Sequence, residues 1–242
     1  MTLLQTAVLV VIALLTATLS GVVGMGGGVI LLGVMASMMP AAMVVPIHGV
    51  VQLGSNCTRT IVFFKHVNWT IFKYYAPAMI IGVFAATMLW SGDKLTGFKP
   101  LIGAFILVFL LSRKFKPTWK NPPMPAYVVL GVFAGFISMF IGATGPFIAP
   151  FFLRDDLDKE GVIATKAVCQ TAGHLLKIPA FVSLGFDYVH HTELLVVLLI
   201  MVIAGTLIGK KLLSFLDQKT FVVIFIVILS LLSVRLLVSP WL

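Results

Sequence analysis

Apolar segments of nearly membrane-spanning length follow one another along almost all of this 242-residue chain, of which 60% is hydrophobic and only 10% charged. A helix needs about 20 apolar residues to cross a bilayer, and backbone in hydrocarbon must satisfy its hydrogen bonds within the protein. We therefore predict an all-α polytopic membrane protein, embedded in the lipid bilayer and without a soluble domain. The apolar segments fall at about 3–23, 28–38, 42–64, 70–91, 98–112, 126–142, 146–153, 161–184, 192–212 and 220–238.

Two glycine-rich breaks interrupt the apolar sequence, Gly-Met-Gly-Gly-Gly at 24–28 and Ile-Gly-Ala-Thr-Gly-Pro at 141–146. Glycine lacks a Cβ, so its backbone N–H and C=O groups are open to close approach by other atoms. Such backbone persists in a membrane only where it is buried in protein or lines a cavity. The breaks therefore indicate a functional site. The candidate binding residues within them are Gly26, Gly27, Gly28, Thr144 and Gly145.

The two halves of the chain repeat each other at a constant offset of 118 residues. The matched pairs include Ser20 with Ser138, Gly24 with Gly142, Gly27 with Gly145, Gln52 with Gln170, Asn56 with His174 and Arg59 with Lys177. Weak internal symmetry of this kind is typical of secondary transporters. We predict an N-terminal transmembrane repeat over 1–112, a basic cytoplasmic linker over 113–125 and a C-terminal transmembrane repeat over 126–242.

The distribution of Lys and Arg between the loops indicates a topology. Each half is expected to form a re-entrant hairpin from its broken helix, followed by three transmembrane helices, so that the second repeat is inverted. In this topology one side of the membrane has only three loop cations, Lys94, Lys99 and Arg235. The other side has Lys65, Lys73, Arg113, Lys114, Lys116, Lys120, Arg154, Lys159, Lys210, Lys211 and Lys219. Since cytoplasmic loops are rich in Lys and Arg, we expect a protein of the cytoplasmic (inner) membrane with both termini outside the cytoplasm.

Polar side chains recur at helical spacing within two of the apolar segments. They are His48, Gln52, Ser55, Asn56 and Arg59 in the first repeat, and Lys166, Gln170, His174 and Lys177 in the second. Spacings of three and four residues place each set on one helix face. Such groups must face a partner or a wet cavity, because exposure to lipid would cost several kcal/mol each. For Gln52 and Gln170 taken alone, hydrogen bonding to neighbouring helices explains their presence as well as a functional role does.

Asp and Glu occur only at the ends of the predicted spans or in loops, which bears on the charge of the ligand. Arg59 and Lys177 would then be intramembrane cations without an acidic partner, an arrangement that suits an anionic substrate. Helix N-termini at the two breaks would also favour an anion. The predicted substrate site comprises Gly26, Gly27, Gly28, Gln52, Asn56, Arg59, Thr144, Gly145, Gln170, His174 and Lys177. His48 and Lys166 are candidates for coupling to a proton or sodium ion, and His174 could also accept protons.

Other classes of protein fit the sequence less well. The excess of 17 Lys and Arg over 8 Asp and Glu is expected from cytoplasmic loops, not from nucleic-acid binding. The break at 24–28 is not a dinucleotide fingerprint, because Val29 stands where the pattern needs Gly or Ala. We expect no cofactor, no metal and no enzymatic activity, and the sequence does not indicate an oligomeric state.

The whole chain resembles the TauE/SafE family, the sulfite exporter or toluene sulfonate uptake permease family. The resemblance depends on the 24–28 motif, the duplicated architecture and His66-Val67-Asn68-Trp69, which is similar to the family's Gly-x-Val/Ile-Asp/Asn-Trp turn. Thr144 and Pro146 depart from a second Gly-Gly-Gly motif. The resemblance implies transport of small sulfur-containing anions such as sulfite, sulfoacetate or other organosulfonates.

We therefore predict a secondary transporter that moves such an anion by alternating access, in the export direction. Two alternatives remain open. The first is a membrane thiol–disulfide carrier that uses Cys57 and Cys169, although these miss the repeat symmetry and form no Cys-x-x-Cys pair. The second is a passive anion channel.

Overall fold

The computed structural model describes residues 2–23, 26–90, 98–112 and 121–212, together with isolated positions between 227 and 238. These residues form helices and no strands. The α-helices are α1 (Leu3–Val23), α2 (Gly27–Met38), α3 (Ala41–Val62), α4 (Trp69–Leu89), α5 (Phe98–Ser112), α6 (Met124–Ile141), α7 (Gly145–Phe152), α8 (Lys159–Ser183) and α9 (Thr192–Leu212). The short 3-10 helices are η1 (Phe64–His66) and η3 (Val189–His191). The predicted all-α class is confirmed, with helix ends within a few residues of those expected. The predicted helix at 220–238 and most of the linker lie outside the described ranges.

Four of the described helices are long and apolar enough to cross a membrane, namely Leu3–Val22, Trp69–Leu89, Met124–Ile141 and Val189–Leu212. The helices α3 and α8 have 22 and 25 residues and also have the necessary length. They are not among the four because the polar side chains predicted above lower their hydropathy. A multi-pass membrane protein follows from this pattern.

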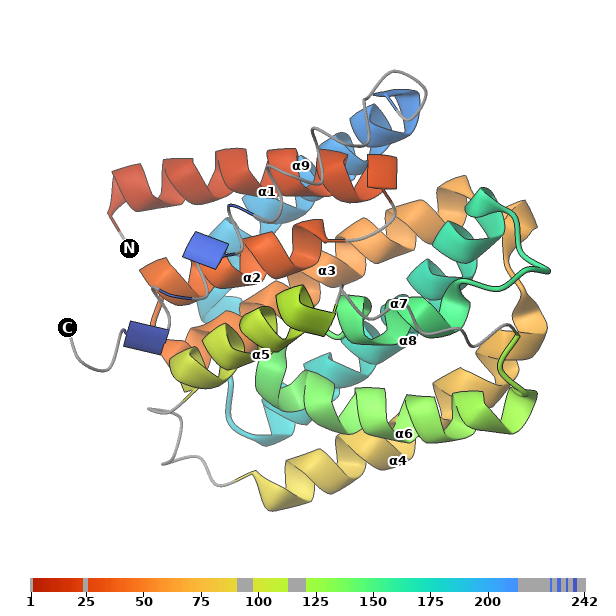
Figure 1. Cartoon of the computed structure of the whole chain (residues 1–242). Coiled ribbons are helices and arrows are strands. Elements are labelled where there is room, and N and C mark those ends of the chain that lie inside the picture. The colour runs from red at the N-terminus through yellow and green to blue at the C-terminus, as the bar shows by residue number, and fades with distance from the viewer. Residues whose placement is uncertain are drawn as a thin grey trace.

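The chain reverses direction at both glycine breaks (Figure 1). After α1, the start of α2 lies against the last turns of α1, since a Cβ on Gly27 would collide with the Thr16 carbonyl and the Ser20 hydroxyl. After α6, the Tyr127 hydroxyl near its start donates a hydrogen bond of 2.6 Å to the Phe151 carbonyl near the end of α7. Each break is therefore the tip of a helical hairpin. In Figure 1 the two hairpins run in opposite directions, and α2 and α7, which follow the two breaks, contact each other.

Two helix pairs flank this centre, α1 with α9 and α4 with α6 (Figure 1). In both pairs glycines bring the backbones together: a Cβ on Gly205 or Gly209 would collide with α1, and one on Gly131 or Gly135 would collide with α4. Both glycine pairs have the small-xxx-small spacing that permits close approach of helices in membranes. The pairs correspond under the sequence repeat, because α1 matches α6 and α9 matches α4.

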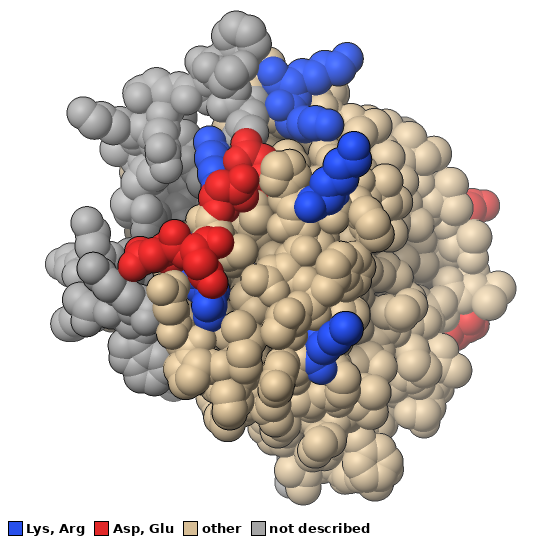
Figure 2. All heavy atoms as spheres, turned by 90° about the vertical axis from the view of Figure 1, so that its right-hand side faces the viewer, with Lys and Arg blue, Asp and Glu red and all other residues tan. Residues whose placement is uncertain are grey.

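Charged side chains gather at one end of the helices, the face shown in Figure 2. His66 Nδ1 lies 3.5 Å from Asp158 Oδ2, which joins η1 to the loop after α7. Lys210 Nζ lies 5.7 Å from the centre of the Phe63 ring, which joins the end of α9 to the end of α3. The end of α3 with η1, the start of α8 and the end of α9 therefore lie at one end of the molecule, with Lys65, Lys159 and Lys210 in these segments.

Candidate functional site

Both hairpin tips depend on a glycine in a backbone conformation that other residues rarely adopt. Gly26, with φ 98°, is the N-cap of α2, and Gly142, with φ 87°, is the C-cap of α6. A positive φ lets the chain turn between two helices within a few residues. The N-termini of α2 and α7 are thereby placed in the middle of the molecule. The amides of Gly27, Gly28 and Gly145 precede the first intrahelical hydrogen bonds, which run from Val29 and Ile30 to the Gly26 carbonyl and from Ile148 to the Thr144 carbonyl.

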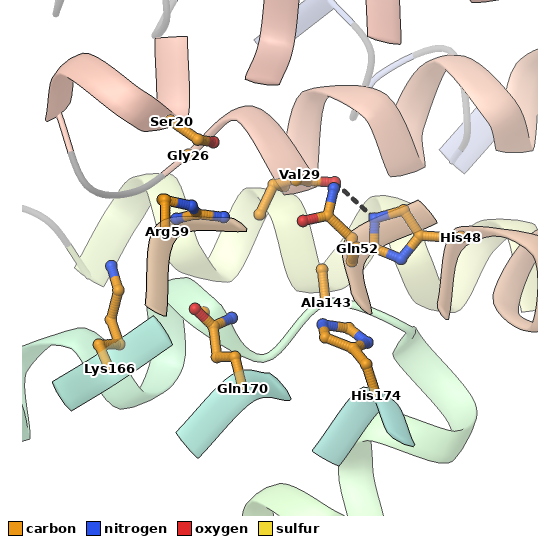
Figure 3. Close-up of a pocket in the computed structure, with 12 residues that line it drawn as sticks. Ser20, Gly26, Val29, His48, Gln52, Arg59, Ala143, Lys166, Gln170 and His174 are labelled. Atoms are coloured by element: carbon orange, nitrogen blue, oxygen red, sulfur yellow. Dashed lines mark hydrogen bonds between the residues drawn. The ribbon is translucent and has the colours of Figure 1, made fainter. Parts of the chain in front are cut away.

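A small cavity lies between these two helix N-termini (Figure 3). Its volume is about 20 Å³, enough for roughly one water molecule. The helices α3 and α8 supply most of its polar wall. The lining residues are Ser20, Gly26, Gly28, Val29, His48, Gln52, Arg59, Ala143, Gly145, Lys166, Gln170 and His174.

Arg59 and Lys166 form the cationic end of the cavity (Figure 3). Their exposed fractions are only 3% and 1%. Arg59 donates from Nε to the Ser55 carbonyl at 3.4 Å and from its guanidinium to the Ser55 hydroxyl at 3.3 Å, both on its own helix. Among the residues that the structure describes, no Asp or Glu is buried. The cavity therefore carries positive charge.

The side-chain amides of Gln52 and Gln170 lie in the middle of the cavity, one on each helix N-terminus. A Cβ on Gly28 would come within 3.0 Å of Gln52 Oε1, and one on Gly145 within 2.8 Å of Gln170 Nε2. These repeat-matched glutamines thus occupy equivalent places against α2 and α7. The absence of a side chain at each glycine makes room for the amide.

The two histidines form the other end of the cavity (Figure 3). His48 Nε2 lies 2.8 Å from the Gly28 carbonyl oxygen, to which it donates. The rings of His48 and His174 meet edge to face with their centres 6.2 Å apart. Nδ1 of each ring is buried and has no hydrogen-bond partner among the described atoms.

Four residues of the predicted substrate site lie beside the cavity and do not line it. Lys177 Nζ donates a hydrogen bond of 2.7 Å to the Gly142 carbonyl, and Asn56 Nδ2 donates one of 2.9 Å to the Gln52 carbonyl. Gly27 lies against α1, and Thr144 is the buried N-cap of α7. The remaining predicted substrate residues line the cavity, as do both candidate coupling residues, His48 and Lys166.

Three residues that line the cavity were not predicted, namely Ser20, Val29 and Ala143. Val29 and Ala143 are apolar neighbours of the breaks, and nothing in the sequence distinguishes them from packing residues. The sequence did contain a hint that Ser20 lies at the cavity, since it precedes the first break by about one turn and matches Ser138 in the second repeat. The repeat match alone does not predict a place at the cavity, however. Ser138 does not line it and donates to the Gly135 carbonyl of its own helix.

Comparison with known proteins decides the family. The model of the sulfite exporter TauE/SafE family matches residues 9–236, almost the whole chain. The chain belongs to the TauE/SafE family. The resemblance inferred from the 24–28 motif and the duplicated architecture is therefore confirmed, and TauE/SafE membership makes this a protein of a transporter family.

A curated relative supports the same assignment over part of the chain. It is the probable sulfite/organosulfonate exporter TauE of Cupriavidus necator, 28% identical over 144 residues. The match covers 56% of this chain and 56% of the relative, so it spans about half the length of each protein. No solved structure matches this TauE/SafE chain.

Proposed function

We propose that this protein is a secondary transporter that exports a small sulfur-containing anion, such as sulfite, sulfoacetate or another organosulfonate, across the cytoplasmic membrane. The observation that carries the proposal is the meeting of Arg59 and Lys166 with the N-termini of α2 and α7 at one buried cavity. Helix N-termini and intramembrane cations both favour an anion. The name of the relative from Cupriavidus necator supports sulfur oxyanions as the class.

In this site Arg59 and Lys166 supply charge, while the first turns of α2 and α7 offer backbone N–H groups. Gln52, Gln170 and His174 orient the oxygens of the anion. Lys177, matched to Arg59 in the repeat, supports the second break through its bond to the Gly142 carbonyl. Because the cavity has a volume of about 20 Å³, a sulfite or sulfonate group requires the two glutamine amides to move away from Gly28 and Gly145.

Alternating access would come from two inverted repeats that rock against each other around this cavity. The opposite directions of the two hairpins and the corresponding α1–α9 and α4–α6 pairs support this symmetry. Glycine contacts in both pairs would let each move as a unit. With the cationic end of Figure 2 in the cytoplasm, both termini lie outside.

The thiol–disulfide alternative has weaker support. Cys57 and Cys169 are both free, and Cys169 is buried among apolar side chains such as Ile71 and Tyr75. Neither cysteine lines the cavity. Since a reactive thiol needs access and a nearby positive charge, the cysteines are better explained as packing residues.

The test is anion binding followed by transport. Purified protein is heated with sulfite, sulfate, thiosulfate, sulfoacetate, taurine or chloride, because a ligand that binds the native state raises the unfolding temperature. Arg59→Gln and Lys166→Gln should abolish a selective shift, whereas Lys73→Gln, which alters an exposed cation, should retain it. No selective shift with any of these anions contradicts the proposal.

Transport itself is measured in proteoliposomes with the anion that binds. Uphill movement of this anion under an imposed proton or sodium gradient is expected of a secondary transporter. Movement only down the anion's own gradient would instead favour the passive channel.

A further inference from the structure

His48 has a defined tautomer because of its partner. The Gly28 carbonyl oxygen can only accept a hydrogen bond, so Nε2 of His48, 2.8 Å away, must carry the hydrogen. In the neutral ring Nδ1 is then an acceptor with a free lone pair. This atom is buried and has no hydrogen-bond partner among the described residues. A proton arriving at the cavity therefore has an acceptor ready to receive it.

His174 lies on the opposite wall with the same property. Its exposed fraction is 4%, its Nδ1 has no hydrogen-bond partner in the described part of the chain, and its ring centre is 6.2 Å from that of His48. The pair therefore joins α3 and α8, the two helices that supply most of the polar wall of the cavity (Figure 3). Buried polar atoms usually have partners, so these two ring nitrogens, which have none among the described residues, are candidate acceptors for a proton or a small ligand.

The charged and titratable groups that face His48 decide when this ligand can be a proton. From α8 they are His174 and Lys177 beside it and Lys166 at the opposite end of the cavity, and from α3 itself Arg59, also at that end. The sequences of α2 and α7 contain no titratable residue. All four facing groups are bases, so they repel a proton on the histidine pair while the cavity is empty of negative charge. An anion beside Arg59 and Lys166 removes this repulsion.

We propose that the pair formed by His48 and His174 binds one proton, held at Nδ1 of His48, when the anion enters the cavity. The inference rests on the proposed function and adds the coupling ion: the anion and one proton move together. The proton comes from the solvent on the side where the anion enters, and it leaves with the anion on the other side. By linkage, the proton must strengthen anion binding as much as the anion strengthens proton binding.

Calorimetric titration of the purified wild-type protein tests this proposal directly. The probe is sulfoacetate, whose two acidic groups stay ionised between about pH 6 and pH 8. Titrations in buffers of different ionisation enthalpy give the number of protons taken up. We expect about one proton per anion, and a Kd that falls about tenfold for each pH unit lowered within the window where the pair titrates.

Three variants complete the test. His48→Gln should remove proton uptake and the pH dependence of Kd, and His174→Gln, which leaves the bond to Gly28 in place, should weaken both. His190→Gln, which alters an exposed histidine, should behave as wild type. If His48→Gln does not fold, the wild-type titration and His174→Gln still decide the question.

The failures of the two proposals are distinguishable. If sulfoacetate binds without proton uptake, the histidine proposal is wrong but the proposed anion transport is not contradicted. The same conclusion follows if both His48→Gln and His174→Gln keep the full pH dependence of Kd. If none of the sulfur oxyanions of the thermal panel binds at any pH, the proposed function itself is wrong. If only sulfite binds, the titrations use sulfite, with its own protonation measured separately and subtracted.

Discussion

Lys177 Nζ donates a hydrogen bond of 2.7 Å to the carbonyl oxygen of Gly142, the residue whose positive φ ends α6. The matching cation of the first repeat, Arg59, instead lines the cavity and bonds to Ser55 on its own helix. Two residues at equivalent sequence positions thus have different environments. One supports the backbone of a break, and the other faces the space between the breaks.

Replacement of Lys177 should therefore affect stability more than anion affinity. Lys177→Met removes a charged hydrogen bond, which typically contributes about 1.5–3 kcal/mol, and leaves the Gly142 carbonyl without its partner. We expect a lower unfolding temperature in detergent with less than a tenfold change in anion Kd. Lys177→Arg, which keeps a donor, should restore part of the stability. A large loss of affinity with unchanged stability would place Lys177 in the anion site instead.

Arg59→Gln and Lys166→Gln should each weaken anion binding by about 30-fold or more, since removing one partner of a buried charge pair typically costs about 2–5 kcal/mol. The measurement is the Kd from calorimetric titration at one pH. Lys73→Gln is the matched control, because Lys73 is exposed on α4. Equal affinity of all four proteins would show that the buried cations are structural.

The glycines at the start of α2 should differ in their tolerance of alanine. The three atoms nearest to a Cβ at Gly28 all belong to the Gln52 amide, which can move, whereas a Cβ at Gly27 would collide with the Thr16 backbone. We expect Gly28→Ala to fold and to change anion affinity, and Gly27→Ala to lower the unfolding temperature by several degrees or prevent folding. Combining Gly28→Ala with Gln52→Asn, a shorter amide, should restore stability that Gly28→Ala loses. A Gly27→Ala variant as stable as wild type would contradict this packing.

The loop after α7 should show a pH-dependent stability of defined sign. Arg154 donates to both carboxylate oxygens of Asp156, at 2.6 and 2.8 Å, and also to the Pro122 carbonyl at 2.8 Å. The Arg154 guanidinium lowers the pKa of Asp156 below its ordinary value of 3.8. Its contribution is therefore present above that pH and is lost as the pH falls through the lowered pKa.

Asp156→Asn should consequently lower the unfolding temperature slightly near neutral pH and make no difference in strong acid. The effect is small because Asp156 is half exposed. Arg154→Gln should cost more, since the Pro122 bond is lost as well. Thermal unfolding of the two variants across pH measures both differences. An Asp156→Asn variant that is destabilised equally at every pH would show that the ion pair is not the cause.

A variant with Cys57→Ser and Cys169→Ala should keep full transport in proteoliposomes, because neither thiol lines the cavity. Alanine is chosen at position 169 because that site is fully buried in an apolar cluster, where a hydroxyl would lack a partner. Loss of transport with normal folding would revive the thiol–disulfide alternative.

The sequence by itself determined the helices, the two breaks and the charge of the site. Length and hydropathy specify helices because lipid leaves the backbone no other partner, and positive φ at Gly26 and Gly142 requires the residue found there. His48, Gln52 and Arg59 share a face because helical spacing is fixed. For these reasons most of the predicted residues, including Gln170 and His174, line one cavity.

Only the tertiary structure decided which members of the matched pairs line the cavity: Gln52 and Gln170 both do, whereas Arg59 does and Lys177 does not. Helical spacing places Lys166 and Lys177 on one face of α8 but does not say which one reaches the cavity. The answer depends on how α8 crosses α3 and on the position of the Gly142 carbonyl, which takes Lys177 as its donor. Ser20 reaches the cavity for the same kind of reason, since the packing of α1 against α2 is set by contacts between distant parts of the chain.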